Sequence, residues 1–579
     1  MDNQRLLLFV ALVVVVMMIW AAWQQDYGGR HPTPTTTSQP APGTQAQGAA
    51  GSQPAGKAAP AGPGAPAAAR DGAGVAHTDL PPSTGAAKPR QQPAQATPTR
   101  VLPTARRIHV DTDIMRATLD TTGGDLRRLV LPHYAVSAKK PDQPFVLMND
   151  TLPKLFVLQS GLLTSDGPQP THHVQYTADR TDYKLGAGQN SVKVALHWRS
   201  PEGVTVTKIY TFHRGSYVVN LEHKVHNGSS KPWTGRVYRQ LQRTQVAEPG
   251  ATAFIHTYMG GVIYSPEDKF QKIDFSQMVK QNLSRDIKGG WAAMTQHYFL
   301  GAVIPPAGLT DHYYTKVLSH SRYVIGMVAP AVTIAPGADH DYKSRLYLGP
   351  KLQNRLATVA PGLDLTVDYG KLTVLAQPIF WALSKLHGFL GNWGWAIIVL
   401  TILIKAAFYK LSETSYRSMA QMRKMAPRLK ALRERYGDDK QRLNQAMMEL
   451  YKTEKINPLG GCLPIVVQIP VFIALYWVLL ESVELRQAPW VLWIHDLSTP
   501  DPYYVLPLIM GVTMLIQNRL NPAPMDPLQK KMMMVLPIAF TAFFAFFPSG
   551  LVLYWVVNNT LSIAQQWSIT RRIERGAKA

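Results

Sequence analysis

The stretch Trp393–Leu411, WGWAIIVLTILIKAAFYKL, is almost entirely apolar and is long enough to cross a bilayer as one helix. Lys405 lies inside this stretch, where insertion of a cation costs at least about 2–3 kcal/mol. In one interpretation, the Lys405 stem bends so that its ammonium reaches the headgroups. In the other, Lys405 faces a hydrated cavity and attracts a negative group there. The rest of the chain has to distinguish these two interpretations.

The composition favours a membrane over nucleic acid as the partner of this basic chain. The 579 residues carry a formal net charge of +23, which suits either partner. The basic residues form no single stripe, and many lie beside hydrophobic segments, as in membrane proteins. Cys462 is the only cysteine, so the chain has no internal disulfide.

The N-terminal part predicts an anchor followed by a tether. Leu6–Trp23 is an apolar run preceded by Arg5 and followed by bulky residues without an A-x-A cleavage pattern. We therefore expect an uncleaved transmembrane anchor over 1–25, with its N-terminus in the cytoplasm. Residues 26–99 are rich in Pro, Ala and Gly and nearly lack large apolar residues, which predicts a disordered linker.

Residues 100–371 predict a large antiparallel β-sandwich on the exported side of the membrane. Short runs such as VTVTKIYTFHR and SYVVNLEHKVHN alternate in polarity with a period of two, and turn signals such as Asn227-Gly228 separate them. The pairs His172-His173 and His223 with His226 resemble metal ligands. In strand-rich, polar surroundings we expect surface histidines instead, and no metal site.

Residues 372–391 predict an amphipathic helix in the outer membrane interface, after which Gly391-Asn392 turns the chain into the span at 392–411. Residues 412–458 predict a cytoplasmic helical hairpin, with Gly437 ending its first helix and Asp438 capping its second. An apolar seam runs along the first helix at Met422, Met425, Leu429, Leu432 and Tyr436.

The hairpin is strongly basic, and its charge allows two interpretations. It is either a solvated hairpin whose charge only sets topology, or a docking arm for a nascent chain, a ribosome or anionic lipid. The residues that we assign to such recruitment are Arg423, Lys424, Arg428, Lys430, Arg433 and Arg435.

Residues 459–570 predict four further spans, and 571–579 form a basic tail. The spans are about Cys462–Leu480, Tyr503–Asn518, Met532–Phe547 and Leu551–Ile569. Basic residues gather at the N-terminus, the hairpin, the Lys530 loop and the tail, whereas the loop after Leu480 is acidic. The positive-inside rule then gives six spans with both termini in the cytoplasm.

The predicted spans lack the groups that common membrane chemistries require. All histidines and carboxylates lie outside them, which argues against an intramembrane protease and an ion-coupled transporter. The chain has no phosphate-binding Gly loop with Lys and Ser/Thr, so we expect no ATP hydrolysis. The spans do hold neutral polar residues that suggest a cavity shared with Lys405: Thr401, Gln468, Thr513, Gln517, Asn558, Asn559, Thr560, Ser562, Gln565 and Gln566.

From residue 391 onward the sequence closely resembles the YidC/Oxa/Alb family of membrane protein insertases. The runs that carry the resemblance are GNWGWAIIVLTILIK (391–405), GDDKQR (437–442), NPLGGCLP (457–464), SVELRQAPW (482–490), WIHDLS (493–498), DPYYVLP (501–507) and FPSGLVLYW (547–555). The anchor, linker and β-domain resemble the Gram-negative form of the family, with weaker motifs.

The resemblance implies a five-helix core in the bacterial inner membrane around a hydrophilic groove, with the β-domain in the periplasm. Position 405 matches the family's positively charged groove residue, which is commonly Arg. Lys at this position keeps the positive charge but lacks the planar guanidinium that binds a carboxylate with two hydrogen bonds. Thr401 matches a substrate-contact position, and so does Trp555, where relatives commonly have Tyr. The hairpin over Glu413–Glu454 is implicated in recruitment. The implied partners are nascent membrane proteins, SecYEG with SecDF, the ribosome with signal recognition particle components, and membrane lipids.

We therefore expect a membrane protein insertase and chaperone that uses neither a cofactor nor covalent catalysis. The alternatives are a small-anion transporter, with Lys405 as its binding charge, and an assembly scaffold that inserts nothing. The expected groove residues are Lys405, Thr401, Gln468, Gln517, Trp555, Asn558 and Asn559.

Overall fold

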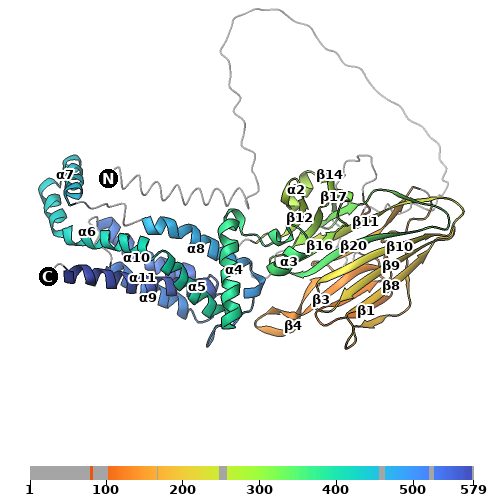
Figure 1. Cartoon of the computed structure of the whole chain (residues 1–579), viewed down its shortest axis with the longest axis horizontal. Helices are drawn as coiled ribbons and strands as arrows, with labels where there is room; N and C mark the ends of the chain where they lie inside the picture. Colours follow the sequence, from red (N-terminus) through yellow and green to blue (C-terminus); the bar gives the residue numbers. More distant parts are fainter. Residues whose placement is uncertain are drawn as a thin grey trace, which may run out of the picture. The chain divides into compact units, whose positions relative to one another are not determined.

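The computed structural model describes residues 79–81, 102–165, 167–246, 257–437, 439–454, 463–520 and 527–576. The anchor predicted over 1–25 and nearly all of the linker predicted over 26–99 lie outside these residues. The described residues between 102 and 350 form strands and one short helix, and those from residue 373 onward form helices and their connections (Figure 1). The prediction of a β-rich domain followed by a helical region is confirmed.

The strands form two sheets with a main hydrophobic core between them and smaller separate clusters, one of them around Val206 and Val237. An 11-stranded sheet has the order β14-β17-β18-β11-β5-β3-β2-β1-β7, with β19 beside β11 and β4 beside β3. A 9-stranded sheet has the order β13-β12-β15-β16-β20-β10-β9-β8-β6. Side chains from both sheets share the core, among them Leu129 of β3 and Leu221 of β10. Pairing is antiparallel except between β1 and β7.

The strands and the short helices of the β-domain have the following bounds: β1 (Arg107–Asp111), β2 (Arg116–Asp120), β3 (Asp125–Ser137), β4 (Lys140–Met148), β5 (Phe156–Thr164), β6 (Thr177–Ala178), β7 (Asp182–Lys184), β8 (Ser191–Arg199), β9 (Val204–His213), β10 (Val218–Asn227), β11 (Trp233–Thr244), β12 (Gly260–Ser265), β13 (Lys269–Ile273), α2 (Phe275–Lys280), β14 (Ser284–Lys288), β15 (Trp291–Thr295), β16 (Phe299–Ile304), β17 (Thr310–Leu318), β18 (Arg322–Val328), β19 (Val332–Ile334), β20 (Asp339–Pro350) and α3 (Gln353–Val359).

Alternation along β9 carries a lysine into the core. Every second residue of Val204–His213 is buried, as a strand with one covered face requires. Lys208 falls on the buried face and is 0% exposed. Its ammonium donates to the carbonyl oxygens of Gly123 at 2.6 Å and Ser160 at 2.8 Å. Burial lowers the pKa of Lys208 to about 8, because the interior disfavours the charged form.

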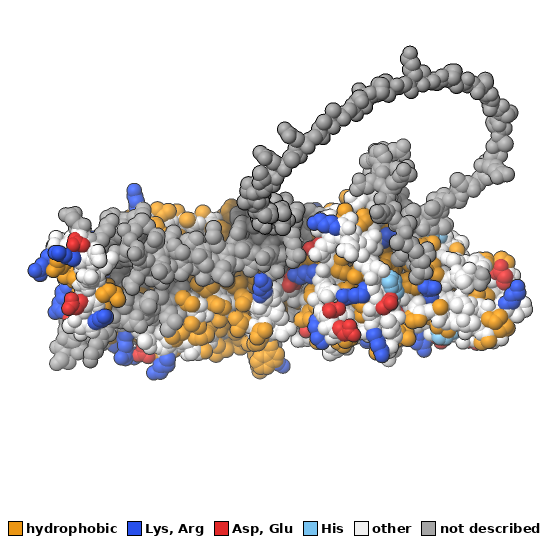
Figure 2. Space-filling view, turned by 90° about the horizontal axis from the view of Figure 1, so that it is seen from above, with side chains coloured by type: hydrophobic (Ala, Val, Ile, Leu, Met, Phe, Trp, Pro, Cys, Tyr) orange, Lys and Arg blue, Asp and Glu red, His pale blue; other side chains and the backbone are white. Residues whose placement is uncertain are grey.

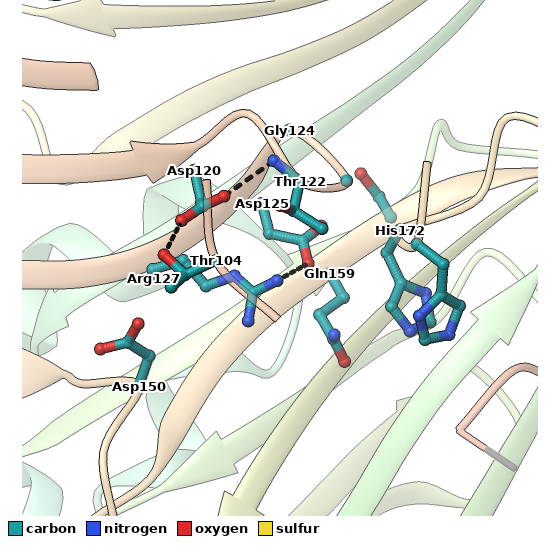
Figure 3. A network of polar contacts seen from close by, with 12 residues as sticks. Thr104, Asp120, Thr122, Gly124, Asp125, Arg127, Asp150, Gln159 and His172 are labelled. Atoms are coloured by element: carbon teal, nitrogen blue, oxygen red, sulfur yellow. Dashed lines mark hydrogen bonds and ion pairs between the residues drawn. The ribbon is translucent and has the colours of Figure 1, made fainter. Parts of the chain in front are cut away.

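Further buried charges lie close to the β2–β3 turn (Figure 3). Asp125 pairs with Arg127 at 3.2 Å, and both side chains are almost fully buried. Burial raises the pKa of Asp125, although the cationic charge of Arg127 opposes the shift. Asp120 accepts from the backbone N–H of Thr122 at 2.7 Å and thereby closes the turn.

The expectation of surface histidines is wrong for two of the four named positions. His172 is 1% exposed, and its backbone N–H donates to the Tyr238 hydroxyl at 2.9 Å. His223 is 0% exposed, and its Nε2 lies 3.2 Å from the Ser160 hydroxyl. Both take part in the polar interior of the sandwich, whereas His226 is exposed and pairs with Asp339. Strand periodicity alone does not tell which face of a two-sheet domain is covered.

The helical region contains α4 (Thr373–Leu390), α5 (Trp393–Ala407), α6 (Tyr409–Tyr436), α7 (Lys440–Thr453), α8 (Leu463–Glu481), η4 (Val483–Leu485), α9 (Val505–Leu520), α10 (Pro527–Phe544) and α11 (Ser549–Gly576). The amphipathic helix predicted after residue 372 is present as α4. Gly391, with φ of 66°, ends it, and the Asn392 side chain caps α5 by accepting from the backbone N–H groups of Gly394 and Trp395.

The helix predicted over Trp393–Leu411 ends four residues early. Phe408 leaves helical geometry, and α5 and α6 meet there at a bend of 67°. Within the described residues, no single helix has both the length and the apolar composition of a span, although α5 and α6 together pass that test. Lys405 therefore lies in the last turn of an apolar helix and not in the middle of a longer one. Hydrophobic side chains gather along the helical part of the surface (Figure 2).

The hairpin forms as α6 and α7, with two differences from the prediction. Its core joins Met425 and Leu429 to Met422, Met447 and Leu450 across the two helices. Leu432 and Tyr436 do not belong to this core, so the predicted seam continues on α7 instead of along α6. Asp439, not Asp438, caps α7, because its carboxylate accepts from the backbone N–H groups of Gln441 and Arg442.

The buried pair Arg239–Asp311 yields a stability prediction. The two side chains are 1% and 0% exposed and lie 3.5 Å apart. We expect Arg239→Met to lower the free energy of unfolding by about 3–5 kcal/mol, because Asp311 would remain buried without its cation. Calorimetric unfolding of the full chain in detergent measures this loss. Arg236→Met, at an exposed position on the same strand, is the control, and an equal loss in both variants would contradict the prediction.

Candidate functional site

Lys405 is held at the end of α5 by a hydroxyl group. Its ammonium donates to the Ser562 Oγ of α11 at 2.7 Å. The Ser562 hydroxyl in turn donates to the Asn558 carbonyl oxygen one turn earlier, also at 2.7 Å. Lys405 is half-buried and forms no ion pair within the described parts of the chain. The hydrogen-bond partner of the Lys405 ammonium is therefore a neutral hydroxyl, and no carboxylate among the described residues neutralises the ammonium.

A small cavity lies beside the Lys405 side chain. It measures about 10 Å³, which is room for about one water molecule. Its polar lining comes from Lys405, Ser412 and Gln468, and the remaining lining residues are Ile404, Phe408, Leu411 and Val467. Of the residues that the sequence predicted to share a polar cavity, only Lys405 and Gln468 line this one.

Gln468 connects this cavity to α11. Its side-chain amide donates to the Asn558 Oδ1 at 2.7 Å, so that α8 and α11 are joined by a hydrogen bond between neutral groups. Asn558 and Ser562 are four residues apart on one helix and therefore share a face. Lys405, Gln468 and Asn558 thus form one polar group at the meeting of α5, α8 and α11.

Five of the seven predicted groove residues do not line this cavity; Asn558 is bonded to Gln468, and the other four lie elsewhere. Thr401 is 1% exposed, and its hydroxyl donates to the Ile397 carbonyl oxygen within α5. Asn559 donates to Thr513 of α9 at 3.3 Å. Gln517 is half-buried on α9. Trp555 packs against Phe472 and Phe544, with ring centroids 5.0 and 5.7 Å away, and its indole N–H is buried without a partner among the described residues.

Ser562 is the functional side chain that the sequence did not single out. It was one of ten neutral polar residues in the predicted spans, and it is the one that holds Lys405. The sequence does contain a signal, because Asn558, Ser562 and Gln566 recur every four residues along one helix. All three are at least nine-tenths buried, which marks the polar face of α11 that packs inward.

The basic hairpin residues form a second candidate surface. All six predicted recruitment residues, Arg423, Lys424, Arg428, Lys430, Arg433 and Arg435, are exposed on α6. Arg428 pairs with Glu454 at 2.6 Å and thereby links α6 to the end of α7. Figure 2 shows charged side chains at the hairpin end of the helical region. This surface suits an anionic partner.

Two family models match successive parts of the chain. Residues 107–382 match the YidC periplasmic domain, and residues 385–576 match the 60Kd inner membrane protein. The chain is 49% identical to the membrane protein insertase YidC of Nitrosococcus oceani, over 99% of this chain and all of that protein. It is 50% identical to the same insertase of Methylococcus capsulatus, over 99% of each chain. A crystal structure of an active YidC insertase is similar with a TM-score of 0.36 at 17% identity, over 81% of this chain and 93% of that one.

The cavity beside Lys405 predicts which side chains near it are accessible to water. With Cys462 replaced by Ala, we expect Lys405→Cys and Gln468→Cys to react with a charged, membrane-impermeant thiol reagent added on the hairpin side. Leu400→Cys, 4% exposed on the same helix, should stay unlabelled because it packs in the core. If Lys405→Cys and Gln468→Cys resist labelling as Leu400→Cys does, Lys405 only reaches toward the headgroups.

Proposed function

The chain belongs to the YidC family, and we propose that it inserts proteins into the inner membrane and helps them fold and assemble, alone or with the Sec translocon. One observation carries the mechanism: within the described residues, Lys405 at the end of an apolar helix is bonded to a hydroxyl and to no carboxylate. Its charge therefore remains available to an acidic group on the hydrophilic tail of a substrate.

In this mechanism, the polar group at Lys405 shortens the apolar barrier that a hydrophilic tail must cross. A carboxylate on the tail replaces the Ser562 hydroxyl at the ammonium, since a charge-assisted bond is the stronger of the two. Gln468 and Asn558 replace part of the water that the tail loses. No covalent step is involved. Lys405 attracts the carboxylate by its charge, but it cannot form the bidentate hydrogen bonds that an arginine guanidinium forms.

The small volume of the cavity requires the helices around it to separate before a tail can enter. A space of about 10 Å³ admits no peptide, and it is bounded by side chains of α5, α6 and α8. The element best placed to move is the junction of α5 and α6, where Phe408 already interrupts the helix. We infer that substrate entry spreads this junction and enlarges the cavity.

The substrate helix leaves toward lipid along the surface of α9 and α10. Both helices expose large apolar side chains, including Leu508 at 59%, Val535 at 58% and Ile538 at 67%. An apolar substrate helix gains free energy by leaving a polar cavity for such surroundings. Thr401, Gln517, Trp555 and Asn559 are proposed to contact the substrate only in a wider state.

The proposed topology has six spans, with both termini in the cytoplasm and the β-domain in the periplasm. The first span, over 1–25, is joined by the linker 26–99 to the β-domain at 100–371. The remaining segments are the interfacial helix 372–391, the second span 392–411, the hairpin 412–458, the last four spans within 459–570 and the tail 571–579. The distribution of basic residues supports this orientation.

The hairpin is proposed to recruit the translation machinery and its nascent chains. Its exposed basic face on α6 suits the ribosome and signal recognition particle components, and anionic lipids as well. SecYEG and SecDF are proposed partners for substrates with large translocated parts. These partners follow from the family resemblance, and the exposure and charge of the hairpin support them.

Depletion of the protein tests the function itself. We expect insertion of a membrane substrate with a short hydrophilic tail to slow strongly when the protein is depleted, because the tail then meets the full apolar barrier. Protease protection of the tail in inverted vesicles measures the rate. Tails that cross at the normal rate in depleted vesicles would rule out the insertase and favour a scaffold.

Substitution of Lys405 tests the electrostatic step. We expect Lys405→Ala to slow insertion of substrates with acidic tails by about tenfold, the scale of one charge-assisted hydrogen bond, and to affect neutral tails much less. Lys405→Arg is the matched control and should retain insertion, because it keeps the charge. Equal effects of Lys405→Ala on acidic and neutral tails would remove the role of the charge.

A further inference from the structure

A second and larger cavity lies where the β-domain meets the segment that follows α8. Its volume is about 400 Å³. On the β-domain side it is lined by Tyr134, Tyr217 and Arg355, and on the side of the helical region by Glu484 and Arg486. None of these residues belongs to the polar group at Lys405, and the proposed insertion mechanism uses none of them.

The walls of this cavity are fixed by contacts between its two sides. The Arg486 guanidinium donates to the carbonyl oxygens of Ala135 at 2.6 Å and Val136 at 3.1 Å, and it lies over the Phe299 ring at 5.5 Å. The backbone N–H of Gln353 donates to the Glu484 Oε1 at 3.3 Å. A cavity bounded in this way is formed before any ligand arrives, which lowers the entropic cost of binding.

Besides Arg486, which is engaged by backbone carbonyl groups, the cavity is lined by Arg355 and Glu484, which form no ion pair with each other. Arg355 is exposed and donates to the Gly215 carbonyl oxygen at 2.8 Å, and within the described residues it forms no ion pair. Glu484 likewise has no ion-pair partner there, and its Oε2 is buried without a hydrogen bond. Burial raises the pKa of Glu484 to about 7, because no cation compensates the loss of water. A ligand with both charges would satisfy both groups.

In the proposed topology, where α8 crosses the membrane, the cavity lies at the depth of lipid headgroups. The apolar helix α8 ends at Glu481, so Glu484 is three residues beyond it and at most roughly 10 Å away along the chain. The headgroup layer on each side of a bilayer is about 5–8 Å thick. A zwitterion at this depth is most simply a phospholipid headgroup.

We propose that this cavity binds the headgroup of an ethanolamine phospholipid from the outer leaflet, with the phosphate on Arg355 and the primary ammonium on Glu484. The free carboxylate oxygen of Glu484 can accept a hydrogen bond, and a primary ammonium supplies both a donor and a positive charge, whereas a trimethylammonium has no donor. A glycerol headgroup lacks the cation altogether. The inference rests on the membrane placement in the proposed function, and it adds a lipid that holds the β-domain against the membrane part.

Native mass spectrometry of the full chain in detergent tests this site. We expect the wild-type protein to retain phosphatidylethanolamine about tenfold more strongly than phosphatidylcholine or phosphatidylglycerol, the scale of one charge-assisted hydrogen bond. Glu484→Gln should abolish the preference for ethanolamine, and Arg355→Gln should weaken retention of all three lipids. Arg199→Gln and Glu202→Gln are matched controls at exposed positions near the β8–β9 turn, and both should behave as wild type.

Two results would overturn the proposal. One is equal retention of the ethanolamine lipid by the wild type, Glu484→Gln and Arg355→Gln. The other is displacement of the lipid by soluble phosphoethanolamine at comparable concentration, which would assign the site to a free zwitterion. Substrate insertion by the wild-type protein is measured separately in vesicles. A protein that retains the lipid selectively and inserts nothing would refute the proposed function and leave the lipid site standing.

Discussion

The proposed mechanism depends on Lys405, a cation at the end of an apolar helix that forms no ion pair among the described residues. Lys405 is tied to Ser562, and that hydroxyl is tied in turn to the backbone of its own helix. An ammonium in apolar surroundings is costly, and a neutral oxygen offsets only part of that cost. The remaining cost is what an acidic substrate group would relieve. The incompletely compensated ammonium thus costs free energy when no ligand is bound, and for the same reason it attracts an anionic ligand.

In the β-domain, by contrast, the buried charged side chains have partners within the chain. Arg239 has Asp311, Arg127 has Asp125, and Lys208 has two backbone carbonyl groups. Among these contacts, those of Lys208 join one sheet to Ser160 of the other sheet and to Gly123 in the β2–β3 turn. Buried pairs of this kind add little net stability, but the loss of one partner is expensive. These paired charges suit a rigid domain. At Lys405, in contrast, the proposed mechanism requires the Ser562 hydroxyl to be replaced by a carboxylate of the substrate.

The main architecture can be predicted from the sequence because the spacing of apolar residues indicates which face of a strand or helix is buried. The alternation over residues 204–213 predicted the strand that is present as β9, and the Gly391-Asn392 pair predicted the turn between α4 and α5. Patterns failed where the outcome depends on contacts distant in sequence. Nothing near Phe408 in the sequence announces a bend. The four-residue repeat of Asn558, Ser562 and Gln566 does not tell which of the three bonds Lys405, and His223 is covered by the opposite sheet, where Ser160 lies.

The bend at Phe408 turns α6 into a lever arm whose pivot lies beside Lys405. With 28 residues, α6 is roughly 42 Å long at 1.5 Å per residue. A tilt of about 10° about the pivot would carry its far end through roughly 7 Å, while a group about 5 Å from the pivot would shift by less than about 1 Å. Such a tilt would move the basic tip of the hairpin by several ångströms and leave the ammonium of Lys405 close to Ser562 of α11.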